Sequence, residues 1–125
     1  MKNILIIFLL LGFLNLNAKN YQNTIVMNKL DDIQTQYHLG MRYKDGYRIE
    51  KNLQKAFKCF HKSALKGFIP AQYEFALMFH YGNGVRQNQE LARLWFTRAA
   101  KKGDFRSQSI LHRFYGGPKP LQMKQ

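Results

Sequence analysis

A serine and a lysine three residues apart, Ser63 and Lys66, form the Ser-x-x-Lys pattern in which penicillin-recognising enzymes place their nucleophile. Such a serine must lie at the start of a helix, where free N–H groups stabilise the negative charge that develops during attack. The surrounding spacing instead places Ser63 near a predicted helix end, in a position that Ala99 occupies 36 residues later. We therefore attribute the match to chance and predict no catalytic residue.

Metal and cofactor chemistry is not predicted either. No pair of histidines has the i, i+4 spacing with a neighbouring carboxylate that zinc-binding helices use; the four histidines are His38, His61, His80 and His112. Seven acidic residues in a chain of 125 leave few candidates for a paired general acid and base. Gly82-Asn83-Gly84 is expected to be a turn between helices. We predict no metal, no cofactor and no phosphate-binding loop.

Positive charge is the most unusual feature of the composition. The chain has 20 Lys and Arg residues against 7 Asp and Glu residues, a formal net charge of +13. A charge run often serves only as a solvated face, but it also attracts acidic partners at long range. The cations that recur at helical spacing define a predicted basic stripe, namely Lys55, Lys58, Lys62, Lys66, Arg98, Lys101 and Lys102.

The first 18 residues have the layout of a secretory signal peptide. Lys2 gives a basic start, residues 4–14 form an uncharged apolar run, and Ala18 is a small residue at the expected cleavage point. A bilayer-spanning helix needs about 20 apolar residues, so this run is short for an anchor. We expect cleavage after Ala18 and a periplasmic or secreted protein.

Cys59 is the single cysteine of the sequence, so no disulfide can form within the chain. Free cysteine usually behaves as a small buried apolar side chain, and its position in the repeat described next favours burial. Pairing between two chains is the alternative. Stability is expected to come from packing alone.

The sequence contains an internal repeat of 36 residues, in which residues 36–71 align with residues 72–107 without a gap. Nine of the 36 positions are identical, among them the pairs Gly46 and Gly82, and Asn52 and Asn88. Each copy has apolar residues at helical spacing, a glycine, an asparagine suited to cap a helix, and a second apolar stripe. Each copy is therefore predicted to be a pair of helices.

The repeated strings at residues 39–46, 71–85 and 92–103 resemble the Sel1-like repeat family. That family's unit has a Leu-Gly-x-x-Tyr helix, a Gly-x-Gly-Val turn and an Ala-Ala-x-x-Gly ending. The first copy departs at the turn, where Tyr47-Arg48-Ile49 replaces the second glycine and the valine. The resemblance covers residues 34–115 and implies a right-handed superhelix of antiparallel helix pairs, similar to tetratricopeptide arrays, that binds other proteins.

The predicted fold is all-α, a short α-solenoid of two helix-hairpin repeats plus a half-repeat. The predicted segments are a signal peptide at 1–18, an N-terminal cap at 19–33, repeats at 34–69 and 70–105, a capping helix at 106–116 and a flexible basic tail at 117–125. Asp31 and Gln34 are expected to form a capping box. The apolar side chains expected to lie over the first hairpin are Tyr21, Ile25, Val26, Met27 and Leu30. Dimerisation is the alternative way to cover an open end of the stack.

The first helix of each unit is expected to line the inner side of the superhelix. Equivalent positions there differ between copies while the packing positions agree, as a partner-facing groove would require. The predicted groove residues are His38, Arg42, Asp45, Glu74, Met78, Tyr81, Ile110 and Phe114. The alternative interpretation is that Met78, Ile110 and Phe114 complete the core.

The function expected from these patterns is that of an exported, non-catalytic protein-binding module of the cell envelope. Its partner is expected to be an acidic protein, with an anionic envelope surface as a further candidate, and export argues against nucleic acid. The alternative is a weak β-lactamase, a penicillin-binding protein or a peptidoglycan hydrolase, as implied by the cysteine-rich branch of the same family. Members of that branch carry a cysteine pair in each repeat, which this chain lacks.

Overall fold

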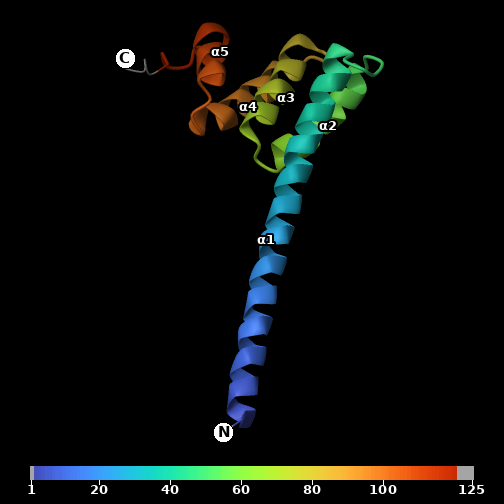
Figure 1. The fold of residues 1–125 in the computed structure, drawn as a ribbon. Coiled ribbons are helices and arrows are strands. Elements are labelled where there is room, and N and C mark those ends of the chain that lie inside the picture. The colour runs from blue at the N-terminus through green and yellow to red at the C-terminus, as the bar shows by residue number, and fades with distance from the viewer. Residues whose placement is uncertain (1, 121–125) are drawn as a thin grey trace. The chain divides into compact units, whose positions relative to one another are not determined.

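The computed structural model describes residues 2–120, except that the side chains of residues 20–31 are not described. Within these residues every regular element is an α-helix, as the all-α prediction requires, and the structure confirms that fold class (Figure 1). The five helices are α1 (Lys2–Asp45), α2 (Leu53–Leu65), α3 (Ile69–Tyr81), α4 (Gln89–Lys101) and α5 (Phe105–Tyr115).

The chain divides into two compact units, Met1–Asp32 and Ile33–Gln125. In the first unit the apolar side chains at the start of α1 are exposed; Phe8, for example, is 70% exposed. The window Lys2–Lys19 has a mean hydropathy of 1.4 and is long and apolar enough to cross a membrane. Signal sequences near an N-terminus have the same length and composition, so this finding fits both a signal sequence and a membrane span.

Helix α1 differs from the sequence prediction because it does not begin near residue 31. Asp31 lies inside the helix, so the expected capping box of Asp31 and Gln34 is wrong. The sequence from residue 13 to residue 39 contains neither proline nor glycine, and nothing in it stops a helix that has already formed. The side chains expected to cap the first hairpin, Tyr21, Ile25, Val26, Met27 and Leu30, lie outside the described residues.

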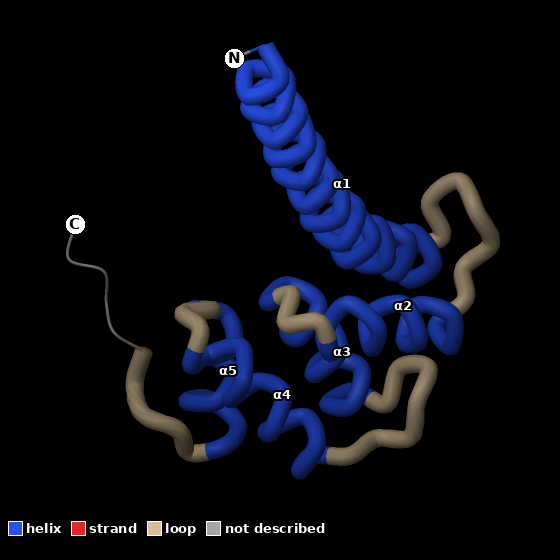
Figure 2. Tube along the Cα trace, turned by 90° about the horizontal axis from the view of Figure 1, so that it is seen from below, coloured by secondary structure: helices blue, strands red, loops and turns tan. Residues whose placement is uncertain are grey.

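The second helix of each pair starts in the same way. Asn52 and Asn88 have the same backbone angles, φ −150° and ψ 102°, and their side chains accept hydrogen bonds from the N–H groups of Lys55 and Leu91. Each asparagine also closes the preceding loop, since the N–H of Asn52 donates to the carbonyl of Tyr43 and that of Asn88 to Phe79. The predicted N-caps are confirmed, and the two loops have equivalent hydrogen bonds. Figure 2 shows these loops in tan, between α1 and α2 and between α3 and α4.

A repeated glutamine joins each pair to the next. The side-chain amide of Gln72 donates to the carbonyl of Ala64 at 3.2 Å, and that of Gln108 donates to Ala100, also at 3.2 Å. These carbonyls belong to the ends of α2 and α4, where the helix itself leaves acceptors unpaired. The same side chain therefore fixes α3 against α2 and α5 against α4.

The core of the second unit consists of large rings between small residues. Phe60 and Phe96 are fully buried, and the alanines beside them, Ala56 and Ala92, are fully buried as well. The centroid of the Phe75 ring lies 4.8 Å from that of Phe57 and 5.0 Å from that of Trp95. Aromatic contacts therefore extend from α2 through α3 to α4.

Cys59 contributes to this packing on α2. It is buried, which favours the interpretation as a small core side chain over pairing between two chains. Burial also raises the pKa of its thiol, so the reactive thiolate form is disfavoured.

Two glycines permit close approach between neighbouring elements. A Cβ at Gly40 would lie 2.7 Å from the ring of Phe60, and a Cβ at Gly84 would lie 2.4 Å from the carbonyl oxygen of Leu53. Gly84 also has a φ of +71°, a left-handed conformation that favours glycine. In the first copy Arg48 takes the position of Gly84, and it adopts a φ of 58° despite its side chain.

Replacing Gly84 by alanine tests the close contact between the loop and α2. Gly84→Ala should lower the free energy of unfolding by at least about 2 kcal/mol, because the left-handed backbone and the clash with Leu53 act together. Gly103→Ala is the matched control, since Gly103 also has a positive φ but has nothing within 4 Å of its Cβ position. Equal losses in urea unfolding of the two variants would contradict the close contact.

Candidate functional site

The predicted groove residues at the end of α1 lie together on the surface. His38, Arg42 and Asp45 are exposed. With Met41 and Tyr47 they line a shallow cavity of about 310 Å³. The lining combines a cation, a carboxylate and an imidazole with the thioether of Met41 and the ring of Tyr47. Methionine, arginine and aromatic side chains are enriched in protein interfaces, so this lining is compatible with binding of a protein segment.

A second exposed group lies where α3 and α5 end. Tyr81 is 60% exposed and Phe114 is 52% exposed, and both rings flank His80, with ring centroids 4.7 Å and 5.2 Å from that of the histidine. We call Tyr81, His80 and Phe114 the aromatic patch. Sequence reasoning selected two of its three members and missed His80, although the side chain directly precedes the predicted groove position Tyr81.

Hydrogen bonds hold the histidine of the aromatic patch. Nδ1 of His80 lies 2.6 Å from the hydroxyl of Tyr115 and 3.1 Å from Oε1 of Gln89. The hydroxyl of Tyr115 donates to the same oxygen of Gln89 at 2.5 Å, and partial burial raises the pKa of Tyr115. Three helices thus position one imidazole, and the patch is a prearranged surface rather than a set of independent side chains.

Three other predicted groove residues are buried or partly buried. Met78 is only 3% exposed and belongs to the core, which supports the alternative interpretation of this position. Ile110 is partly buried and packs against the same core. Glu74 is buried, and its carboxylate accepts a hydrogen bond from Nζ of Lys44 at 3.0 Å. The eight predicted residues therefore do not line one continuous exposed surface. The prediction rested on helix spacing, which does not tell which face of a helix a neighbouring helix covers.

The cations of the predicted basic stripe are all exposed on α2, on α4 or directly after these helices. Arg98 lies over the ring of Trp95, with its guanidinium carbon 4.4 Å from the ring centroid. Nζ of Lys102 lies 3.5 Å from the carbonyl oxygen of Gly67, at the end of the preceding pair. Some of these cations therefore also support the fold.

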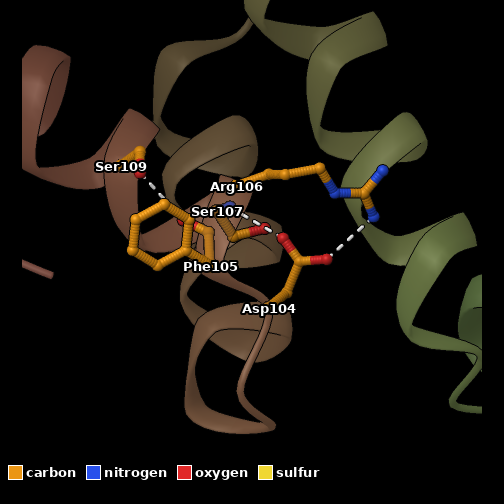
Figure 3. A network of polar contacts seen from close by, with 5 residues as sticks. All are labelled: Asp104, Phe105, Arg106, Ser107 and Ser109. Carbon is orange, nitrogen blue, oxygen red and sulfur yellow. Dashed lines mark hydrogen bonds and ion pairs between the residues drawn. The ribbon is translucent and has the colours of Figure 1, made fainter. Parts of the chain in front are cut away.

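A charged cluster anchors α5, the helix that carries Phe114. Asp104 is the N-cap of α5 and accepts hydrogen bonds from the N–H of Ser107 at 2.7 Å and from the guanidinium of Arg106 at 2.8 Å (Figure 3). Arg106 also lies over the ring of Tyr73 on α3, 4.1 Å from its centroid. Partial burial opposes ionisation of Asp104, but the hydrogen bonds from Arg106 and Ser107 hold its pKa below the usual value.

Ser63 is not placed to act as a nucleophile. It is fully buried near the end of α2, and its hydroxyl donates a hydrogen bond to the carbonyl of Ile33 at 2.8 Å. The structure therefore supports the view that the Ser-x-x-Lys match arose by chance. In the described part of the chain no three His, Cys, Asp or Glu side chains come together in a way that could hold a metal ion.

Comparison with protein families gives a match that covers more than half of the chain. The model described as "Sel1 repeat" matches residues 33–68 and 69–104, so each match begins one residue before the repeat predicted from the sequence. The DAP3-binding cell death enhancer 1 of Rattus norvegicus is 41% identical over 49 residues, which are 39% of this chain and 10% of that protein. Chitin synthase regulatory factor 3 of Schizosaccharomyces pombe is 40% identical over 55 residues, 44% of this chain and 6% of that protein. The chain thus spans a tenth or less of these relatives.

Solved structures have the same fold. A Sel1 repeat protein from Oxalobacter formigenes superposes with a TM-score of 0.64 at 30% identity, over 65% of this chain and 24% of that one. The protein c5321, a protective antigen of uropathogenic Escherichia coli with an SLR fold, superposes with a TM-score of 0.60 at 31% identity. The match covers 71% of this chain and 20% of that one. Cysteine rich protein B of Helicobacter pylori superposes with a TM-score of 0.62 at 24% identity, over 66% of this chain and 62% of that one. At this identity the likeness concerns the fold alone.

The charge on Asp104 predicts a pH-dependent contribution to stability. The folded pKa of Asp104 lies below its ordinary value of 3.8, so its stabilisation is complete above about pH 4 and is lost as the pH falls through the folded value. Asp104→Asn keeps an N-cap acceptor for Ser107 but removes the charge that Arg106 contacts. Thermal unfolding should therefore show a lower Tm for the variant at pH 7 and a narrowing difference below pH 4. A difference that stays constant from pH 7 to pH 3 would contradict the charge effect.

Proposed function

Because the chain belongs to the Sel1 repeat family, we propose that it is a non-catalytic module that binds an acidic protein partner in the cell envelope. The observation that carries the proposal is the aromatic patch, in which Tyr81 and Phe114 are exposed while the histidine between them is held by hydrogen bonds. Aromatic side chains dominate the binding energy of many protein interfaces, because they bury a large area with few rotatable bonds.

The charge of the chain supports the choice of an acidic partner. A formal net charge of +13 repels other basic surfaces and accelerates encounter with acidic ones, and salt screens this effect. The basic stripe is exposed along α2 and α4, so it steers a partner without taking part in the aromatic contact. An anionic envelope surface is the competing target, and vesicles of anionic lipid distinguish it from a protein.

The names of the relatives are consistent with this function. One relative is named for binding DAP3 and another as a regulatory factor of chitin synthase, so both names describe an action on another protein. The burial of Ser63 and the lack of paired cysteines argue against the hydrolase alternative.

The aromatic patch predicts a specific loss of partner binding. Tyr81→Ala and Phe114→Ala should each reduce capture of the native partner from envelope extracts at least about tenfold, as expected for aromatic residues central to an interface. Circular dichroism should be unchanged, because both side chains are exposed. Phe105→Ala is the matched control, since Phe105 is on the same helix and is 51% exposed but makes none of the ring contacts of the patch. If Phe105→Ala lowers capture as much as the patch variants, the patch is not the binding site.

Export predicts a defined N-terminus. When the whole chain is produced in a bacterial host, mass spectrometry of the periplasmic fraction should detect a mature protein that starts at Lys19. Ala18→Phe should accumulate the precursor at the membrane, because the residue before the cleavage point must be small. Recovery of the uncut chain from the cytoplasm would contradict export without affecting the binding site.

A further inference from the structure

A second surface lies between α4 and α5. It contains none of the three side chains of the aromatic patch, although Tyr115, whose hydroxyl contacts His80, also lines it. It is a groove of about 580 Å³ formed by both helices and by residues 116–120, which follow α5. Leu111, Ala100 and Pro118 contribute apolar surface, while Arg93, Lys101 and Lys119 contribute positive charge. None of the described residues that line the groove carries a carboxylate. We call this surface the end groove.

The repeat indicates what kind of element fits the end groove. Shifting the sequence by 36 residues places Leu111 at the position of Phe75 and Arg93 at the position of Phe57. In the preceding pair, the ring of Phe75 contacts Phe57 on one helix and Trp95 on the next, with ring centroids 4.8 Å and 5.0 Å away. By analogy with the contact between Phe75 and Trp95, a helix that packs against Leu111 in the same register would present an aromatic side chain to it.

Charge decides which helix can occupy the end groove. Arg93 takes the position of the half-buried Phe57 in the preceding pair, and Lys101 takes that of the exposed Leu65, so the end groove carries two cations where the preceding pair has apolar side chains. A helix like α4, which itself carries Arg93, Arg98 and Lys101, would bring like charges together. A second copy of this chain would do the same, because its net charge is +13.

We propose that the end groove binds an acidic amphipathic helix of a partner protein, with an aromatic side chain against Leu111 and carboxylates near Arg93 and Lys101. This mode is helix-in-groove recognition, in which apolar anchors give affinity and charges select the partner. The inference goes beyond the proposed function because it concerns a different surface, and it holds whether or not the aromatic patch binds a partner.

Synthetic peptides test the proposal directly on the full chain. The probe is the α4 sequence, Gln89–Lys101, with its three cations replaced by glutamate. Fluorescence anisotropy should show saturable binding of this acidic peptide. Binding should be at least about tenfold weaker for the unchanged α4 peptide, for a probe carrying Trp95→Ala, and for a scrambled peptide of the same composition. Equal binding of the probe and the scrambled peptide would overturn the proposal, because a basic protein attracts any acidic peptide.

Variants of the protein test whether the probe binds in the end groove. Arg93→Glu and Lys101→Glu change exposed side chains and should each weaken probe binding at least about fivefold, with an unchanged circular dichroism spectrum. Leu111→Ala should weaken it as well, whereas Tyr81→Ala should leave it unchanged. Loss of probe binding in Tyr81→Ala would assign the peptide to the aromatic patch and overturn the inference. Analytical ultracentrifugation provides a further test. If the protein self-associates and Arg93→Glu strengthens that self-association, a second copy of the chain occupies the groove, and this result would also overturn the inference.

Discussion

Close approach of neighbouring helices over the buried rings of Phe60 and Phe96 is the constraint on which the rest of this structure depends. Gly40 leaves room for the ring of Phe60, because a single added carbon would lie 2.7 Å from it. Ala56, Ala92 and Phe96 are fully buried in the same core. Interiors are close-packed, so such contacts allow little change of register. The asparagine caps and the glutamine bonds are repeated as well, because the residues that form them recur after 36 positions.

This packing determines which side chains are left for a partner. Once Phe75, Met78 and Phe79 of α3 are used in the core, Tyr81 is directed to the surface, where α5 brings Phe114 to the same histidine. The Asp104 cluster fixes the start of α5 and so determines where Phe114 lies. Fold and candidate site are therefore linked through α5, the helix that follows the second repeat.

The internal repeat made most of the second unit predictable. The periodicity, the caps and the terminating glycines are local signals, and the second helix of each pair begins after the predicted asparagine cap. The start of α1 was not predictable in the same way, because a sequence without proline or glycine continues as helix past a plausible cap. Glu74 and Met78 were predicted to be exposed, but both are buried. Glu74 is paired with Lys44 and Met78 is covered by neighbouring helices, and no local sequence pattern encodes these contacts. His80 acquires its place through Gln89 and Tyr115, two residues from other helices.

Hydrogen exchange followed by mass spectrometry tests the central claim most directly, which is that the two repeats form one continuous core. Equivalent peptides around Phe60 and Phe96 should exchange slowly and at similar rates, and both should be released together as urea is added, because each helix pair buries its apolar face against the other. Fast exchange in one repeat while the other stays protected would mean that the copies fold separately, and it would contradict the account.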